Sequence, residues 1–400
     1  MIKSIFNDIS QKIIFYLLNK ITVGYLCIHI QKTSEEFFFG NENSILKSKI
    51  TVFDNSFFVE LLLNQGMGFA ESYMNGKWDT DNLFNILDVF AKNPHISINK
   101  RFTNFLSLIN TPFNFIYVNT KFFFQKDESK DIQKHYDLSN EMFSLFLDDS
   151  MAYSCALFQN PKDSLNDAQI NKFQSVINGL EIKSKDKFLD IGFGWGGLCN
   201  EVLKNFSCDI DAVTLSEAQL NYVNHNHFSD KKINYELKDF RLIDNKYDKI
   251  SSIEMLEALN YTQISVFFEK IDNILKPGGK LFVQVITIPE SRFQSYKKNK
   301  DFIQKYIFPN GMIHPVNRII KASEKHSNLY VENINDISNN YVTTLNLWKQ
   351  KFNNNIHLIK NLGYDDKFIK KWNYYFDYCA AGFENQLIGN SQIIFSKPKE

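Results

Sequence analysis

The sequence predicts an α/β fold in which helices cover a parallel sheet, preceded by a smaller α+β domain. A chain of 400 residues is long for one compact domain and indicates two. From residue 165 onward, short β-rich runs alternate with helical stretches, which is the pattern of βαβ units. The first of these runs leads into a glycine-rich turn. We expect residues 1–125 to form the N-terminal domain and residues 126–400 the larger domain.

The N-terminal domain is expected to begin with an amphipathic helix, because Ile5, Ile9, Ile13 and Leu17 recur every four residues. Extended runs and then helical stretches follow it. The predicted strands are Ile21–Ile30, Glu36–Phe39 and Lys49–Phe53, and the predicted helices are Asn55–Gln65 and Asp81–Ala91. Asn75-Gly76 predicts a turn between these two helices. The charged stretch Lys126–Lys134 predicts a linker to the larger domain.

The larger domain is expected to contain five parallel strands joined by helices. These strands are Lys187–Ile191, Ile210–Thr214, Ile233–Leu237, Lys249–Ile253 and Lys280–Ile286. The last β-rich run, Gln392–Phe395, predicts an antiparallel strand at the edge of the sheet. Between the fifth strand and this one, residues 288–378 predict a helical insertion.

Composition excludes several classes of protein. Lysine plus arginine equals aspartate plus glutamate, at 45 each, so no global positive field draws the chain to nucleic acid. The five cysteines have no metal-ligand spacing, so we expect no metal and a reducing, cytoplasmic environment. No apolar run has the length of a membrane-spanning helix, and no signal peptide is recognisable. A local basic patch remains compatible with reversible membrane contact.

The glycine turn Gly192-Phe193-Gly194-Trp195-Gly196-Gly197 allows a ligand to approach the backbone where the first strand ends. It also matches the dinucleotide pattern G-x-G-x-x-G, but an NAD site needs an acid at the end of the second strand. That strand ends Thr214-Leu215-Ser216, without a carboxylate. The third strand is followed by Asp239-Phe240-Arg241, which offers an adenine a hydrogen-bond acceptor and a flat apolar face. NAD, or a turn without any cofactor, stays as an alternative.

With the turn Lys276-Pro277-Gly278-Gly279 before the fifth strand, this series resembles the S-adenosylmethionine-dependent methyltransferase fold, a Rossmann-like seven-stranded sheet. Further stretches resemble the cyclopropane-fatty-acyl-phospholipid synthase family, which includes the mycolic acid cyclopropane synthases. They lie within residues 130–396 and around Phe69–Trp78. They are His135–Asn140, Met151–Ala156, Glu254–Ala258, Tyr306–Gly311, Tyr341–Leu345 and Tyr378–Phe383.

The resemblance implies which residues bind S-adenosylmethionine and which surround the reacting carbon. The implied cofactor residues are Tyr153, Ser154, Asp190, Gly192, Gly194, Thr214, Gln219, Asp239, Phe240 and Arg241. Family members also hold a bicarbonate ion, whose implied ligands here are the backbones of Cys155 and Ile286 and the side chains of Glu257 and Tyr341. Gln284 stands where a bicarbonate-binding histidine is usual, and its amide can also donate to an anion. Ala258 replaces another common histidine, and Cys379 matches a functional cysteine.

The implied reaction adds the methyl carbon of S-adenosylmethionine to the cis double bond of an unsaturated phospholipid acyl chain. A carbocation forms, so the pocket must exclude water, and bicarbonate then accepts the proton as a cyclopropane closes. Methyl-branched or methylene-branched products remain alternatives, as do an N-methyltransferase for a small amine and a non-catalytic lipid-binding protein. The lipid substrate predicts peripheral, reversible membrane binding. The resemblance also implies a homodimer.

Overall fold

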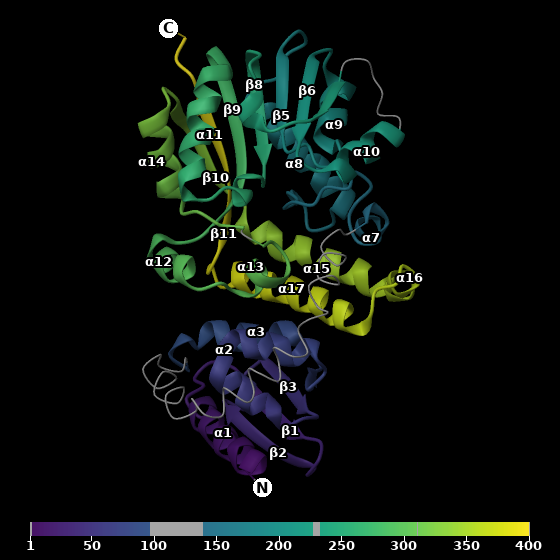
Figure 1. Ribbon diagram of the computed structural model, residues 1–400, viewed down its shortest axis with the longest axis vertical. Coiled ribbons are helices and arrows are strands. Elements are labelled where there is room, and N and C mark those ends of the chain that lie inside the picture. The colour runs from purple at the N-terminus through teal and green to yellow at the C-terminus, as the bar shows by residue number, and fades with distance from the viewer. Residues whose placement is uncertain (1, 97–138, 227–232, 310, 400) are drawn as a thin grey trace. The chain divides into compact units, whose positions relative to one another are not determined.

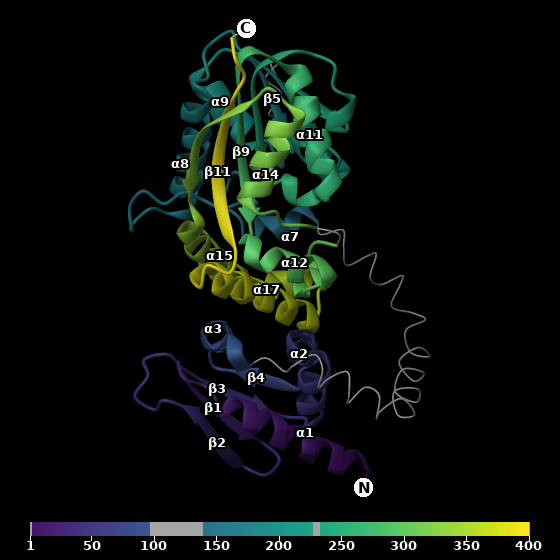
Figure 2. The same cartoon turned by 90° about the vertical axis from the view of Figure 1, so that its left-hand side faces the viewer.

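The computed structural model describes residues 2–96, 139–226, 233–309 and 311–399 (Figures 1 and 2). Its chain divides into two compact units. The first consists of Met1–Leu138 and Lys360–Ala381, and the second of Ser139–Ile359 and Gly382–Glu400. The predicted linker Lys126–Lys134 and the His135-Tyr136 part of a quoted motif lie outside the described residues. Residues 360–378, which we expected in the helical insertion, thus group with the N-terminal residues.

The first unit contains a four-stranded sheet in the order β2-β1-β3-β4. Strand β1 runs antiparallel to β2 and parallel to β3, and β4 is antiparallel to β3. The three predicted helices and the three predicted strands are present, whereas the three-residue strand β4 is too short to leave a pattern in the sequence. Its elements are α1 (Ile2–Leu18), β1 (Tyr25–Ile30), β2 (Glu35–Gly40), β3 (Lys47–Val52), α2 (Ser56–Met74), β4 (Trp78–Thr80), α3 (Leu83–Lys92) and a 3-10 turn (Pro94–Ile96).

Helix α2 is longer than predicted and is interrupted where we expected it to end. Gln65 has a non-helical backbone, with φ 49° and ψ −128°. The helix resumes so close to its first part that a Cβ on Gly68 would lie 2.0 Å from the carbonyl oxygen of Glu60. Only glycine permits that approach.

The second unit contains the predicted seven-stranded sheet, in the order β10-β11-β9-β8-β5-β6-β7. Strands β7, β6, β5, β8 and β9 are mutually parallel, and β11 is antiparallel to both of its neighbours, β9 and β10. The strands are β5 (Lys187–Ile191), β6 (Asp209–Thr214), β7 (Ile233–Leu237), β8 (Tyr247–Ile253), β9 (Leu275–Thr287), β10 (Tyr330–Asp336) and β11 (Gly389–Ser396).

One strand prediction was wrong in its position. We expected Gln392–Phe395 at the edge of the sheet, but β11 lies between β9 and β10. The edge strand is β10, which lies inside the stretch predicted to be helical. Six of its seven residues are exposed, so the apolar alternation by which a sequence reveals a strand is missing.

Helices cover both faces of this sheet (Figures 1 and 2). Helices α8, α9 and α10 lie on one face, and α11 and α14 lie on the other. Each face has its own buried apolar cluster. The helices of the second unit are α7 (Asn140–Ser144), α8 (Leu165–Leu180), α9 (Gly197–Asn205), α10 (Glu217–His225), α11 (Tyr261–Ile274), α12 (Glu290–Lys298), α13 (Phe302–Tyr306), α14 (Val316–His326) and α15 (Ser338–Asn354). Helix α16 (Ile356–Asn361) crosses the boundary between the two units, and most of α17 (Asp366–Glu384) belongs to the first. None of the described helices is long and apolar enough to cross a membrane.

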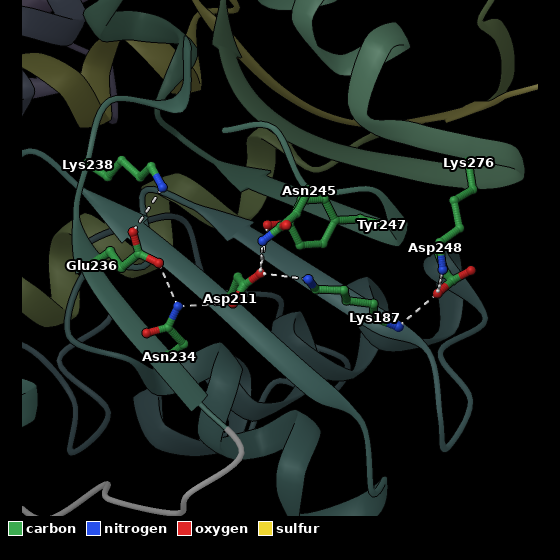
Figure 3. Close-up of polar contacts among 9 residues, drawn as sticks. All are labelled: Lys187, Asp211, Asn234, Glu236, Lys238, Asn245, Tyr247, Asp248 and Lys276. Carbon is green, nitrogen blue, oxygen red and sulfur yellow. Dashed lines mark hydrogen bonds and ion pairs between the residues drawn. The ribbon is translucent and has the colours of Figure 1, made fainter. Parts of the chain in front are cut away.

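A polar network joins four neighbouring strands of the sheet (Figure 3). Asp211 of β6 accepts a hydrogen bond from the Tyr247 hydroxyl at 2.7 Å and pairs with Lys187 at 3.4 Å, linking the first residues of β8 and β5. The Asn234 amide bridges Asp211 and Glu236, which extends the network to β7. These contacts satisfy the polar groups of strands whose opposite, carboxyl ends carry the site described next.

Candidate active site

The glycine turn after β5 has the open, left-handed backbone that a ligand site requires. Gly192, Gly194 and Gly196 have φ values of 86°, 59° and 85°. A Cβ added to Gly194 would meet no atom within 4 Å, so open space lies beside this residue. Helix α9 begins at Gly197, and its free backbone N–H groups therefore lie at the same edge. These features fit a cofactor that approaches the backbone closely.

The second strand brings together two residues that the sequence assigned to the cofactor. Thr214, the last residue of β6, donates a hydrogen bond from its hydroxyl to the Gln219 side-chain oxygen at 2.6 Å. The adjoining Leu215 and Ser216 supply no carboxylate for a dinucleotide ribose. The geometry agrees with the sequence in disfavouring NAD.

The corner after β7 is less open than predicted. Asp239 accepts hydrogen bonds from the backbone N–H and the Nε of Arg241, both at 2.9 Å. Phe240 is buried and packs edge-on against Phe267, with ring centroids 5.6 Å apart. Little of its ring is therefore available to an adenine, and its role as an adenine platform stays a prediction.

Asp190 lies beneath the turn rather than on its surface. Its carboxylate accepts hydrogen bonds from the Ser251 hydroxyl at 2.6 Å and from the Cys199 thiol at 3.6 Å. Burial raises the pKa of Asp190 to about 6. The hydrogen bond with Ser251 links β5 to β8 next to the glycine turn. Asp190 therefore stabilises the turn from the buried side.

Ser154 has a partner that the sequence did not reveal. Its hydroxyl accepts a hydrogen bond at 3.0 Å from the ammonium group of Lys172, a residue of α8 that is 1% exposed. Burial lowers the pKa of Lys172 to about 8. Nearby carboxylates, of which Asp148 has the largest effect, act in the opposite direction and raise it. A lysine in an amphipathic helix normally predicts a solvated face, so sequence pattern alone gives no signal for this position.

Aromatic rings gather beside Ser154. The ring of Tyr153 lies 5.2 Å from that of Phe143 and 5.3 Å from that of Trp348, measured between centroids. Tyr341 stacks on Phe383 at 4.5 Å. Such faces stabilise a nearby positive charge by roughly 0.5–2 kcal/mol each.

The most highly connected polar group of the site is the carboxylate of Glu254. Its Oε1 accepts hydrogen bonds from the Cys155 backbone N–H at 3.0 Å, the Gln284 amide at 3.0 Å and the Asn390 amide at 2.6 Å. Its Oε2 accepts one from the Tyr341 hydroxyl at 2.7 Å. Four neutral donors from separate segments of the chain thus converge on one carboxylate.

The backbone at Glu254 is held in an unfavourable conformation. Glu254 follows directly after β8 and has a φ of 48°. For a residue with a side chain, the left-handed region costs roughly 1–2 kcal/mol. The backbone is held there partly by a 2.7 Å hydrogen bond from the Glu254 N–H to the carbonyl oxygen of Gln284. Strain of this kind persists where the surroundings fix it, and it clusters at functional sites.

Buried amides fix which end of Gln284 faces Glu254. The Gln392 amide donates to the Gln284 oxygen at 3.0 Å, and the Ser175 hydroxyl donates to the Gln392 oxygen at 2.8 Å. Gln284 therefore presents its NH2 group to Glu254 and to the Cys155 carbonyl oxygen. In this structure the Gln284 amide donates to a carboxylate of the protein, and its contact with a bicarbonate ion stays a prediction.

Glu257 contacts one of the other residues implied to hold bicarbonate, namely the backbone of Ile286. Its Oε1 accepts the Ile286 backbone N–H at 2.5 Å, and its Oε2 is buried without a hydrogen-bond partner among the described residues. Burial, and next the charge of Glu254, raise the pKa of Glu257 to about 8. The predicted set is therefore split, because Cys155 and Tyr341 contact Glu254 while Ile286 contacts Glu257.

This arrangement does not fit a bicarbonate ion. Each donor implied for that ion, namely the N–H groups of Cys155 and Ile286 and the hydroxyl of Tyr341, already donates to a protein carboxylate. A second anion among them would meet the charge of Glu254 at close range. The bicarbonate cage therefore stays a prediction, and these contacts do not favour it.

Two residues of the site, Glu254 and Asn390, were not among those predicted from the sequence. Glu254 lies in the motif Glu254–Ala258, and a carboxylate at the carboxyl end of a parallel strand is the sequence signal that points to it. Asn390 precedes an apolar run and carried no signal. Cys379 lies on α17 and falls in the first unit, whereas Glu254 belongs to the second. The functional role that the resemblance implied for Cys379 stays a prediction.

Comparison with known proteins identifies the family of the chain. The family model of mycolic acid cyclopropane synthetase matches residues 124–393. The chain is 31% identical over 330 residues to the tuberculostearic acid methyltransferase UfaA1 of Mycobacterium tuberculosis, covering 80% of this chain and 76% of the relative. It is 30% identical over 366 residues to the cyclopropane-fatty-acyl-phospholipid synthase of Escherichia coli, covering 90% of each.

A solved structure shows the same likeness. The structure of mycolic acid cyclopropane synthase CmaA1 complexed with SAH and CTAB aligns with a TM-score of 0.61 and 25% sequence identity. The alignment covers 67% of this chain and 98% of that one. These matches show that the chain belongs to the mycolic acid cyclopropane synthetase family of S-adenosylmethionine-dependent methyltransferases.

Proposed function

We propose that this methyltransferase adds the methyl carbon of S-adenosylmethionine to the cis double bond of an unsaturated phospholipid acyl chain, giving a cyclopropane. The observation that carries the proposal is the juxtaposition of the open Gly194 turn, an aromatic wall around Tyr153, and a held carboxylate, Glu254, in one unit. A cofactor turn, a surface that tolerates a cation and a group that accepts a proton are the three things that alkene methylation requires.

The residues divide this work among themselves. S-adenosylmethionine supplies an electrophilic methyl group on a sulfonium. The glycines leave room for a ligand against the backbone, and the pair Thr214–Gln219 lies at the same edge of the sheet. Buried rings such as Trp348 and Phe383 exclude the water that would capture a cation.

A methyl-branched or methylene-branched chain is the second candidate product. The observation that favours it is the 31% identity with a tuberculostearic acid methyltransferase over 80% of this chain. Cyclopropane closure and methylene formation begin with the same cation and differ in where the final electron pair goes. The same site is therefore compatible with both products.

Expression in a bacterial host that makes unsaturated phospholipids, but no cyclopropanes, tests the proposal. We expect unsaturated acyl chains to gain one CH2 unit, measured by lipid mass spectrometry, and proton NMR to show ring protons for a cyclopropane or vinylidene protons for a methylene branch. A Gly194→Leu variant should give no modified lipid. Unchanged acyl chains together with methylation of added small amines would contradict the proposal and support an N-methyltransferase.

A lipid substrate also implies contact with the membrane surface. A hollow of about 450 Å³ between α11 and α14 is lined by the basic residues Arg318, Lys321 and Lys325. Arg318 is already paired with Glu290, which leaves the two exposed lysines for a lipid headgroup. We propose that the N-terminal domain and residues 288–330 contact the membrane reversibly. The homodimer implied by the resemblance stays a prediction.

We expect the protein to sediment with vesicles that contain anionic phospholipid, and less with purely zwitterionic ones. Each basic residue near such a surface contributes about 1 kcal/mol, so the double variant Lys321→Glu/Lys325→Glu should bind at least roughly tenfold more weakly. The control is Lys183→Glu/Lys185→Glu, which reverses two exposed lysines in the turn before β5. Equal losses in both double variants would show a nonspecific charge effect and remove α14 from the contact.

A further inference from the structure

Glu254 satisfies the requirements of a catalytic base that belongs to the chain itself. Both of its carboxylate oxygens are held by uncharged hydrogen-bond donors. The residue is half-buried, whereas the donor side chains Gln284 and Asn390 are completely buried. Its carboxylate is thus fixed from the protein side and still partly accessible from the other.

Its position places it beside the cofactor turn. A Cβ on Gly192 would lie 3.2 Å from the Cβ of Met255, so the residue after Glu254 packs against the first glycine of that turn. The backbone N–H of Cys155 donates a hydrogen bond to Glu254, and Cys155 lies two residues after the aromatic Tyr153 in the sequence. The carboxylate therefore lies between the turn and the aromatic wall, where the acyl double bond has to meet the methyl group.

We propose that the carboxylate of Glu254 takes the place of bicarbonate and is the proton acceptor of the reaction, so that turnover needs no bicarbonate. This inference rests on the proposed function. Three independent observations carry it. Donors implied for the ion contact Glu254, the Glu254 backbone is held at a φ of 48°, and buried amides orient Gln284 toward it.

The step balances in atoms and electrons. The π electrons of the double bond form a carbon–carbon bond to the methyl carbon, the sulfur–carbon bond breaks with its electrons on sulfur, and the neighbouring acyl carbon becomes a cation. Glu254 then accepts a proton from the added methyl group. The electron pair of that C–H bond closes the cyclopropane or, after a hydride shift on the chain, forms a methylene double bond. The protonated Glu254 releases its proton to water, and no oxidant or reductant is involved.

Tyr341 and Asn390 act as positioning residues in this account. Each donates one hydrogen bond to Glu254, at 2.7 Å and 2.6 Å, and so stabilises the ionised form that accepts the proton. A hydrogen bond to a charged group contributes about 1.5–3 kcal/mol, which is also enough to fix the carboxylate in one orientation.

The test uses the purified full-length enzyme, S-adenosylmethionine and vesicles of unsaturated phospholipid, in buffer freed of carbon dioxide. We expect the wild-type rate to be the same with and without added bicarbonate. Glu254→Gln keeps the shape of the side chain and removes the base, so turnover should fall by about 10²-fold or more. Its affinity for S-adenosylmethionine, measured by calorimetry, should stay within about threefold of wild type, because the lost step is proton transfer.

A second variant makes the test independent of any effect on folding. Glu254→Gly relieves the backbone strain at φ 48° and leaves a cavity lined by the same four donors. Added bicarbonate or formate should enter that cavity and restore at least about a tenth of the wild-type rate, while Glu254→Gln should not respond. The control is Glu181→Gly, since Glu181 also has a left-handed backbone, with φ 54°, but lies at the end of α8. It should remain fully active and show no response to bicarbonate.

Three results would overturn the inference. They are wild-type turnover that stops without bicarbonate, full activity of Glu254→Gln, or loss of turnover in Glu257→Gln with Glu254→Gln unaffected. In each case lipid is still methylated by the wild-type enzyme under some condition, so the proposed function survives. If wild type modifies no unsaturated lipid with or without bicarbonate, the proposed function itself fails, and the inference fails with it.

Discussion

Replacing Gly194 with leucine is expected to abolish binding of S-adenosylmethionine while the protein stays folded. A side chain at this position meets no protein atom within 4 Å, so it projects into the space that the cofactor needs rather than into the core. The left-handed backbone, at φ 59°, adds a folding cost of roughly 1–2 kcal/mol. Isothermal calorimetry with S-adenosylmethionine and with its demethylated product measures the effect directly.

Gly76→Leu separates the two consequences of that substitution. Gly76 has a similar φ of 68° and equally open surroundings, but it lies in the first unit, in the turn before β4. This variant should show the same loss of thermal stability as Gly194→Leu and normal cofactor binding. Binding by Gly194→Leu within about threefold of wild type would show that the cofactor does not approach this turn, and the cofactor site would have to be sought elsewhere.

Replacing Glu257 with glutamine is expected to stabilise the fold, increasingly so as the pH rises from 5 to 8. Burial raises the pKa of Glu257 in the folded state to about 8, whereas in the unfolded chain it lies near 4.3. An acid with a raised folded-state pKa contributes stability that is complete below the unfolded pKa and is lost as pH rises through the folded one. Each pKa unit corresponds to about 1.4 kcal/mol, so the loss reaches several kcal/mol by pH 8 as an upper limit.

Glutamine cannot ionise, and its side-chain oxygen can still accept the hydrogen bond from the Ile286 N–H. The difference in the free energy of unfolding between Glu257→Gln and wild type should therefore be small near pH 5, grow up to pH 8 and level off above it. Urea denaturation at a series of pH values measures this difference. Glu324→Gln, at an exposed position on α14, should show no such trend. A difference that stays constant with pH would mean that Glu257 ionises normally in the folded protein.

The functional consequence of this titration is a division of roles between two neighbouring carboxyl groups. Glu254 has four hydrogen-bond donors, while Glu257 has one and a pKa raised by burial to about 8, which suits a neutral acid near pH 7. When two carboxyl groups lie close together, the environment of each decides which one is ionised. The pH series thus tests the ionisation of Glu257, and the Glu254 variants test whether Glu254 accepts the proton.

The sequence by itself determined the features that depend on neighbouring residues. The strand, glycine turn and helix around Gly192 and Gly194 are contiguous, and their pattern predicts both the parallel sheet and the cofactor turn. The absence of an acidic residue directly after Thr214 is also a local feature. It distinguishes the predicted S-adenosylmethionine site from an NAD site. The motif around Glu254 was visible for the same reason, although only as a string of residue types.

Only the tertiary structure decided which carboxylate receives the donors of the site. The donors of Glu254 lie 87 residues away at Tyr341, 99 at Cys155 and 136 at Asn390, and no local pattern encodes such separations. The exposed edge strand β10 escaped prediction because its pairing with β11, rather than its own apolar pattern, makes it a strand. Glu254 and Glu257 are one helical turn apart in sequence, but the left-handed φ of Glu254 sends their carboxylates to different donors, and that backbone angle is fixed by packing rather than by residue type.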